Sequence, residues 1–516
     1  MNRRFPWRAA AAALCLLLMP AVSCLFDRLA LPASARDPDT CLGLPTLAAD
    51  RPASDSAALP QLLYHGAAAP LDEKSRTLYL PVSAAESGAP HELSGVLAAA
   101  DAGVTLAFAP DPAFEDLPSA IAQGHAFRLL ASDGSGAVAA LSVVFTTLPV
   151  LCMDTTDGSD YGDPYAEHSG GVRVFEHSGG VRVFEHSGAS TSDAGWHRRG
   201  MSTRLFKKGS WKLSLTNGFG RPRNISIASL GSDDDWILNS MGMDDLRLRE
   251  MLITRLWNGM QQERGSLLRM ADCAYCEVIL DGEYMGLYLL QRRVDSKFLR
   301  LEKSRDIVLK GGNNAKAKDA TEAFTVKSSP IGEREAQMLA QPLFALSDVS
   351  NIALDTWLDL DVFILFGAMH DNRSIRNTYY LLSPGERGYS ISLLPWDTDL
   401  SFGLGYVQGK GHTLLPLDEE SLPPAHRREY DALLALYPDL GNLIAARWRS
   451  LRSGVLSGEN IADTIGAITN ELDQSGAYAR DAALWGARYG GEDTMDRLYN
   501  FIDMRLEQVD AVYMSE

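Results

Sequence analysis

The sequence is poor in basic residues, in cysteine and in long apolar runs. It has 48 Lys and Arg residues against 66 Asp and Glu residues, a formal net charge of −18 at pH 7. Wrapping of nucleic acid needs a basic face, so we expect no nucleic-acid partner. Beyond the N-terminal segment, no stretch is apolar for long enough to span a bilayer.

The composition is that of a globular protein, with 46% hydrophobic and 22% charged residues. A chain of 516 residues is too long for one ordinary core, so two or three domains are expected. The six cysteines include one CxxC, Cys273 to Cys276. One CxxC supplies half of a zinc site and no second half is visible, so burial or a disulfide is the expected role.

The N-terminus has the pattern of an export signal. Arg3, Arg4 and Arg8 precede an apolar run from Ala9 to Val22, which is short for a membrane span, and Cys24 follows directly. Bacterial lipoproteins are cleaved and acylated at such a cysteine. We therefore expect residues 1–23 to be a signal peptide and the protein to be exported, as a cell-surface lipoprotein anchored in the membrane through Cys24 or as a secreted protein.

Two regions follow the signal. Residues 24–55 are rich in Ala, Pro, Asp and Ser and are typical of a linker. Residues 56–146 contain short alternating runs separated by Gly, Pro, Asp and Ser, which predict a small β-sandwich domain for spacing or docking. The predicted strands are Arg76 to Val82, Val104 to Phe108, Ala126 to Ala131 and Ala137 to Phe145.

A nine-residue repeat occupies residues 167–188, where EHSGGVRVF occurs twice and is followed by EHSG. We expect each VRVFEH to be a strand, with Ser-Gly-Gly turning the chain back. The alternative is a metal site formed by the repeated histidines. Nine extended residues span roughly 30 Å, so neighbouring histidines would meet only in a tight fold. The histidines are His168, His177 and His186.

From residue 147 onward the pattern is mixed α and β. Strands are expected at Trp211 to Thr216 and in two hairpins, and helices at Asp244 to Met260, Trp357 to Met369 and through most of the chain after Asp418. The hairpins are Cys276 to Leu280 with Tyr284 to Leu290, and Asn377 to Leu382 with Tyr389 to Pro395. The late helices include Tyr430 to Ser450 and Asp496 to Tyr513.

The stretch from Met369 to Gly405 carries the strongest chemical signal. A buried helix ends near Asp371, a polar loop leads to Asn377, and a hairpin ends at Asp397-Thr398-Asp399 before Phe402-Gly403. Protein kinases use this order of parts: one Asp orients the acceptor hydroxyl, and an Asn and a later Asp hold Mg²⁺ at the phosphates. In an extended segment, Asp397 and Asp399 would face the same side.

The alternative is that Asp397 and Asp399 are surface caps and that Asp371 is a residue at a helix C-terminus. The loop from Asp371 to Asn377 has one residue more than the kinase motif, and no intact DFG is present. Upstream, Gly200 and Ser202 precede Lys207 and Lys208, which lead into a predicted strand. Backbone N–H groups and one ammonium there would cradle phosphates. Because neighbours in a strand face opposite sides, only one lysine should enter the site, and we favour Lys208.

Seven motifs in the same order resemble the spore-coat protein H (CotH) kinase family over residues 147–516. They are RRGMSTRLFKKGSWKLSL, DDDWIL, DDLRLREMLITRLW, CEVILDGEYMGLYLL, RDIVLKGG, HDNRSIRNTYYLL and PWDTDLSFG.

The resemblance implies an α+β fold: an atypical, two-lobed, protein-kinase-like domain behind the β-sandwich. It implies ATP as cofactor with Mg²⁺ or Mn²⁺, and Ser/Thr acceptors on extracytoplasmic or surface proteins, including the protein itself. Asp371 and Asn377 match the catalytic loop, and Asn377, Asp397 and Asp399 the metal site. Gly200, Ser202, Lys207, Lys208, Arg249 and Glu250 match the nucleotide-binding parts.

One departure bears on function. Gln291 stands where a Glu is common in the family, which puts in doubt any role that needs a carboxylate there. The acidic residues at 371, 397 and 399 and the Arg-Gly loop are present, which favours an active kinase. The alternative is a catalytically weak, kinase-like scaffold or binding module at the cell envelope.

Overall fold

A computed structural model describes most of the chain beyond the N-terminal segment. Among the described residues, no helix combines the length and the apolar character needed to cross a membrane. Cys15, Cys24, Cys41, His177, His186 and Ser202 lie outside the described residues. The described residues are 43–46, 58–82, 93–111, 113–133, 138–156, 163–176, 188–200, 204, 206–312, 314–385, 388–407, 411–417 and 425–514.

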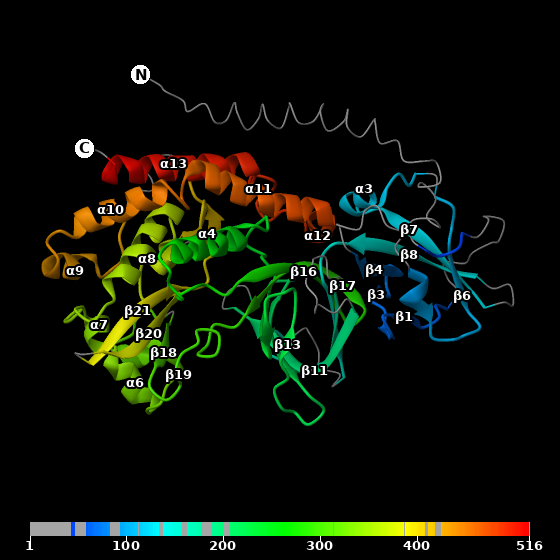
Figure 1. Cartoon of the computed structure of the whole chain (residues 1–516), viewed down its shortest axis with the longest axis horizontal. Helices are drawn as coiled ribbons and strands as arrows, with labels where there is room; N and C mark the ends of the chain where they lie inside the picture. The colour runs from blue at the N-terminus through cyan, green and yellow to red at the C-terminus, as the bar shows by residue number, and fades with distance from the viewer. Residues whose placement is uncertain are drawn as a thin grey trace, which may run out of the picture.

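Three parts lie in a row: an N-terminal β region, a β-barrel and a mainly helical part (Figure 1). The fold is therefore mixed α and β, as predicted. The N-terminal region has a five-stranded sheet, β3-β4-β8-β7-β6, and a three-stranded sheet, β2-β1-β5. Its elements are β1 (Leu62–Tyr64), β2 (Ala67–Ala68), β3 (Leu71–Asp72), β4 (Thr77–Pro81), η3 (Leu93–Gly95), β5 (Leu97–Ala99), β6 (Thr105–Phe108), α3 (Leu117–Ala122), β7 (Ala126–Ser132) and β8 (Val138–Thr146).

The barrel is closed, with the strand order β10-β11-β12-β15-β17-β16-β9. Its interior is apolar and includes Trp196, Trp211 and Trp236, each almost fully buried. The barrel strands are β9 (Val150–Thr155), β10 (Glu167–Glu176), β11 (Gly188–Arg199), β12 (Ser210–Thr216), β15 (Asp235–Asn239), β16 (Cys273–Leu280) and β17 (Glu283–Arg292). The pair β13 (Ile225–Ser226) and β14 (Ser232–Asp233) stands beside them.

The first copy of the repeat does not turn where we expected. Residues 169–171, Ser-Gly-Gly, lie inside β10, which pairs along its whole length with β11. Gly170 is required there because a Cβ would lie 2.0 Å from the carbonyl oxygen of Asp154. His168 is buried between the rings of Trp196 and Trp211, so its environment is that of a core residue.

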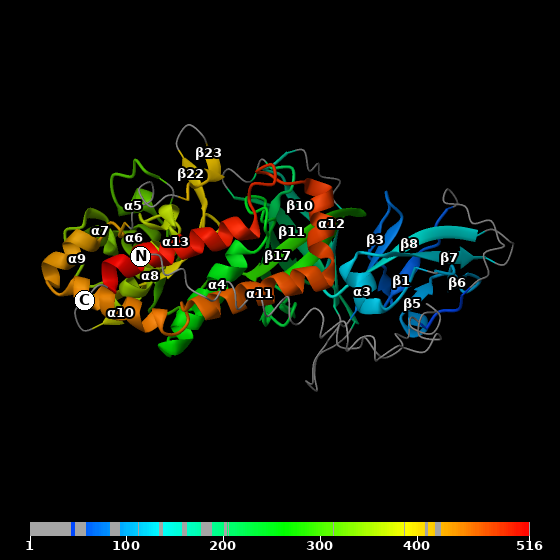
Figure 2. The same cartoon turned by 90° about the horizontal axis from the view of Figure 1, so that it is seen from above.

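The helical part holds the four-stranded sheet β19-β18-β20-β21. Helix α11 lies along α4 and reaches α3 of the N-terminal region (Figures 1 and 2). The elements are α4 (Arg249–Glu263), β18 (Ile307–Gly311), α5 (Ala320–Ala323), β19 (Phe324–Ser328), α6 (Glu333–Leu339), α7 (Gln341–Ala345), α8 (Leu354–Gly367), η5 (His370–Asn372), β20 (Thr378–Gly385), β21 (Gly388–Pro395), β22 (Leu404–Val407), β23 (Gly411–Leu414), α9 (Tyr430–Leu436), α10 (Leu440–Arg452), α11 (Gly458–Ser475), α12 (Ala477–Trp485) and α13 (Met495–Tyr513).

The predicted hairpins and late helices are present, although several boundaries differ from those predicted. Helix α4 begins at Arg249 and not at Asp244, because the Asp244 carboxylate accepts hydrogen bonds from the N–H groups of Leu248 and Arg249 and so caps the helix start. The helix predicted from Tyr430 is divided into α9 and α10, because Pro438 cannot continue a helix.

The N-terminal region and the barrel share one hydrophobic core. Cys152, Ile279 and Tyr284 of the barrel belong to the cluster formed by the N-terminal sheets. The ring of Tyr284 stacks on that of Tyr79 at 4.1 Å and 5°, and the N–H of Glu73 donates to the carbonyl of Gly282. Cys152, Cys273 and Cys276 are all free thiols. Among the described cysteines, no disulfide therefore joins the two members of the CxxC.

Candidate active site

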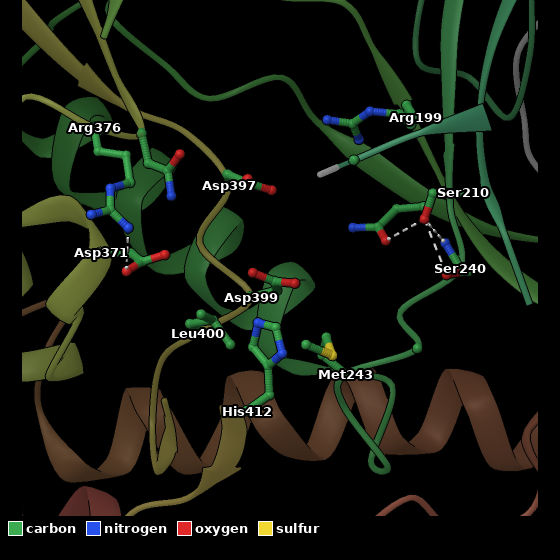
Figure 3. Close-up of a pocket in the computed structure, with 14 residues that line it drawn as sticks. Arg199, Ser210, Ser240, Met243, Asp371, Arg376, Asp397, Asp399, Leu400 and His412 are labelled. Carbon is green, nitrogen blue, oxygen red and sulfur yellow. Dashed lines mark hydrogen bonds and ion pairs between the residues drawn. The ribbon is translucent and has the colours of Figure 1, made fainter. Parts of the chain in front are cut away.

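A pocket lies between the barrel and the helical part (Figure 3). The barrel contributes the ends of β11 and β15 and the start of β12. The helical part contributes the loop after α8, the segment after β21 and one residue of β23. The lining residues are Arg199, Gly200, Ser210, Asn239, Ser240, Gly242, Met243, Asp371, Arg376, Asn377, Asp397, Asp399, Leu400 and His412.

The loop after α8 is held rigidly at the pocket wall. Helix α8 ends because Ala368 adopts a left-handed conformation, with φ at 51°. Asn372 is buried, and its amide donates to the carbonyls of Asn377, at 2.8 Å, and Trp396, at 3.0 Å. Arg427, also buried, donates to the carbonyls of Asn372 and Ser374. These bonds fix the loop to the acidic segment that follows β21.

Asp371 lies in this loop, within η5, and its side chain is 28% exposed in the pocket. Its Oδ1 is 3.3 Å from a guanidinium nitrogen of Arg376. This ion pair orients the carboxylate. Asp371 can therefore accept a hydrogen bond from a hydroxyl that enters the pocket.

The acidic segment is not extended as predicted, because Asp397 is left-handed with φ at 56°. Asp397 and Asp399 nevertheless both line the pocket, opposite Arg199 (Figure 3). Thr398 between them is buried, and both its N–H and its hydroxyl donate to Oε2 of Glu250, at 3.2 and 3.0 Å. Glu250 thus positions the segment that carries the two aspartates.

Gln291 explains how this buried glutamate is accommodated. Its amide nitrogen donates to Oε1 of Glu250 at 3.2 Å. A glutamate at 291 would bring a second carboxylate to that oxygen, whereas the amide completes its hydrogen bonding. The departure from the common family residue therefore suits this chain.

The pocket concentrates negative charge. Burial raises the pKa of Asp399 well above its usual range, and the nearby carboxylates of Asp397, Glu250 and Asp371 raise it further. Burial and Asp397 also raise the pKa of Glu250. Carboxylates crowded in this way gain from a cation among them. Within the described residues, no group of three or more His, Cys, Asp and Glu side chains forms a ready-made metal site.

The barrel side of the pocket offers backbone and hydroxyl groups. Gly200 has φ at 95°, a conformation that side chains other than glycine rarely adopt. The hydroxyl of Ser210 accepts from the N–H of Ser240 at 3.0 Å and lies 3.0 Å from its hydroxyl (Figure 3). Sequence reasoning missed Ser210, Asn239 and Ser240. Ser210 directly precedes the predicted strand Trp211 to Thr216, and Asn239 and Ser240 directly follow the motif DDDWIL, which were the signals they offered.

The two neighbouring lysines face opposite ways, as expected. Lys207 is exposed, whereas Lys208 is buried and donates to Asp481 Oδ1 and to the carbonyl of Leu287, each at 2.5 Å. Neither lysine lines the pocket. Burial lowers the pKa of Lys208 to about 8, against the attraction of Asp481.

Arg249 also lies outside the pocket lining. It is fully buried, forms a two-pronged ion pair with Asp493 at 2.8 and 2.7 Å, and lies 2.5 Å from Asp244. Its Nε donates to the carbonyl of Phe402 at 3.3 Å. Arg249 therefore ties the start of α4 to the end of the acidic segment.

Two cations that sequence reasoning did not assign lie beside the acidic segment. The guanidinium of Arg199 is 5.6 Å from the ring centroid of Trp396, and the ammonium of Lys310 is 5.2 Å from it. Burial lowers the pKa of Lys310 to about 8, while Asp397 works in the opposite direction. Lys310 belongs to the RDIVLKGG motif, and this motif was the sequence feature that could have indicated it.

The profile of the family described as CotH kinase protein matches residues 197–509. This range contains every residue of the pocket lining. A comparison with curated proteins found no match.

Proposed function

Because this chain belongs to the CotH kinase protein family, we propose that it transfers the γ-phosphoryl group of ATP to a Ser or Thr hydroxyl of another protein. The observation that carries this proposal is that Asp371, Asn377, Asp397 and Asp399 line one pocket. In this proposal the barrel and the helical part are the two lobes of an atypical kinase fold, and the nucleotide binds between them.

Asp371 acts on the acceptor. Its carboxylate accepts the hydroxyl proton and orients the oxygen for attack on the γ-phosphorus, and the bond from that phosphorus to the β–γ bridging oxygen breaks. Arg376, 3.3 Å away, orients the carboxylate. The rigid loop around Asn372 holds Asp371 in place, and such positioning is a large part of catalysis in this reaction class.

The donor set fits a hard divalent cation, Mg²⁺ or Mn²⁺. Asn377, Asp397 and Asp399 would supply oxygen ligands. Burial raises the pKa of Asp399, and the neighbouring carboxylates raise it further. When bound, the cation would neutralise charge on the phosphates. A Mg²⁺ site commonly uses one or two carboxylates together with substrate phosphates, so the protein ligands need not converge as a complete cage.

Arg199 and Lys310 are the cations best placed to contact the phosphates, since both lie beside Trp396, which directly precedes Asp397. Gly200 and the Ser210–Ser240 pair offer further donors from the barrel side. Export, anchoring through Cys24 and a protein acceptor at the cell surface belong to this proposal and rest on the N-terminal residues alone.

The test is a calorimetric titration of the purified protein with ATP, with and without Mg²⁺, paired with an assay for phosphate transfer. We expect binding that depends on Mg²⁺ and is weakened in Asp399→Asn, together with transfer that is lost in Asp371→Asn. Binding without transfer in the wild type would favour the scaffold alternative. A protein that binds no nucleotide in either condition would contradict the kinase proposal.

A further inference from the structure

A two-stranded hairpin, β22 with β23, stands at the mouth of the pocket. Its base is joined to the end of the acidic segment: the N–H of Leu404 donates to the carbonyl of Ser401 at 3.0 Å, and that of Leu415 to the carbonyl of Gly403 at 2.8 Å. Leu404 and Leu415 are buried. The hairpin is therefore fixed relative to Asp399.

One face of the hairpin continues the pocket wall outward. Tyr406 is paired directly with His412 across the two strands, so their side chains lie on the same face. His412 lines the pocket (Figure 3). The ring of Tyr406 meets that of His412 edge to face, with centroids 5.2 Å apart, and its side chain is 57% exposed. An aromatic surface thus leads from the pocket into solvent.

This face borders the same pocket as Asp371. His412 and Asp371 both belong to the pocket lining (Figure 3). In the proposed function Asp371 receives the acceptor hydroxyl, so a chain carrying that hydroxyl can extend from the pocket along His412 to Tyr406.

The hairpin also has the features of a peptide-binding edge. In the described part of the chain it pairs with no third strand, so an extended segment can form main-chain hydrogen bonds along it. Val407 on the other face is 37% exposed. Exposed apolar side chains gathered beside a site are typical of an interaction surface, whereas scattered ones need no explanation.

We propose that the face formed by Tyr406 and His412 is the docking surface for an extended acceptor polypeptide, with an apolar residue next to the acceptor Ser or Thr packed on Tyr406. The inference rests on the proposed function and adds the acceptor class: an unfolded segment of a protein. A small hydroxyl-bearing metabolite held inside the pocket would gain nothing from Tyr406, which makes the two acceptor classes separable.

The kinetic test uses a Ser-centred peptide library in which each flanking position is varied in turn. Tyr406→Ala should raise the KM for peptide roughly tenfold and abolish the preference for an apolar flanking residue. The kcat and the KM for ATP should stay within about twofold, and Tyr406→Phe should behave as the wild type. The matched control is Phe219→Ala, because Phe219 is also an exposed aromatic, at 90%, and belongs to a loop outside the pocket lining.

A second measurement does not depend on catalysis. The photoreactive residue p-benzoylphenylalanine is placed at position 406, or at position 219 as control, in full-length protein carrying Asp371→Asn. Light should crosslink the same peptides at 406 and not at 219. Equal crosslinking at both positions, or a peptide KM and flanking preference unchanged by Tyr406→Ala, would overturn the docking surface. If the wild type transfers no phosphate yet position 406 crosslinks peptide, the kinase proposal fails while the docking surface stands.

Discussion

Oε2 of Glu250 accepts hydrogen bonds from both the N–H and the hydroxyl of Thr398, the residue between the two pocket aspartates. The two residues are separated by 148 positions in the sequence. The first turn of α4 thereby sets the position of the segment that carries Asp397 and Asp399.

This contact predicts a loss of Mg·ATP affinity when Glu250 is shortened. Glu250→Ala leaves buried donors of Thr398 and Gln291 without acceptors, which costs about 1–3 kcal/mol for each group and releases the acidic segment. We expect the Kd for Mg·ATP to rise at least about tenfold. Glu250→Gln keeps an acceptor oxygen and should lose less. Calorimetry on both variants checks this, and equal affinity in Glu250→Ala and the wild type would contradict it.

Asp371→Asn should abolish transfer while nucleotide binding is nearly unchanged. An amide keeps the size of the side chain but cannot take the proton of the acceptor hydroxyl, so the lost interaction belongs to the transition state. We expect kcat to fall by about two orders of magnitude or more. Autophosphorylation and ATP titration of the purified variant measure the two effects. Wild-type autophosphorylation in Asp371→Asn would show that the proposed mechanism is wrong.

Asp397→Asn and Asp399→Asn should weaken the binding of Mg·ATP itself, because each removes one hard oxygen ligand. A higher concentration of Mn²⁺ should restore part of the activity in these variants and none in Asp371→Asn. The comparison is made by titrating each cation at fixed ATP. Identical cation dependence in all three variants would argue against separate roles for the acidic residues.

Local patterns predicted most of the individual elements. The alternation of apolar and polar residues predicted β12, β20 and β21. The Asp281-Gly282 turn predicted the hairpin of β16 and β17. The motif order indicated the family, and the profile match over residues 197–509 confirms it. Asp371, Asn377, Asp397 and Asp399 line one pocket. The roles inferred for them from that resemblance stay predictions.

The remaining features depend on contacts between distant segments. Closure of the barrel joins β9 to β16 in parallel, a pairing that periodicity cannot indicate. We favoured Lys208 for phosphate binding because only one of two neighbouring lysines in a strand can face the site. The ammonium of Lys208 instead donates to Asp481, which lies 273 positions later in the sequence. The repeat predicted a turn at the first Ser-Gly-Gly. Those glycines instead belong to a strand, against which the backbone of Asp154 lies close.

Lys310 predicts a specific pH dependence. The pKa of its ammonium is lowered to about 8, and the form that attracts phosphate is the protonated one. The kcat/KM for ATP, which reports groups of the free enzyme, should therefore fall as pH rises through about 8. Lys310→Arg stays charged and should not show the fall, and Lys207→Ala, which removes an exposed lysine, should behave as the wild type. If the kcat/KM for ATP still falls in Lys310→Arg, the titration of another group causes the fall.

Lys208 has two candidate roles: a structural ion pair with Asp481, or the binding of phosphate. Asp481 is buried and accepts from Lys208 at 2.5 Å, from Arg247 at 2.8 Å and from the N–H of Leu287 at 2.9 Å. Asp481→Asn leaves two buried cations without a counter-charge and should lower the free energy of unfolding by about 3–5 kcal/mol. Lys208→Met keeps the pair with Arg247 and should cost less, and the double variant should be more stable than Asp481→Asn alone.

Thermal unfolding and ATP titration of these variants decide between the roles. A structural Lys208 predicts that Lys208→Met shifts Tm and leaves the Kd for Mg·ATP unchanged. A phosphate-binding Lys208 predicts the reverse, a weaker Kd at an unchanged Tm. Because the ammonium already has a carboxylate and a carbonyl as partners and lies outside the pocket lining, we expect the first outcome.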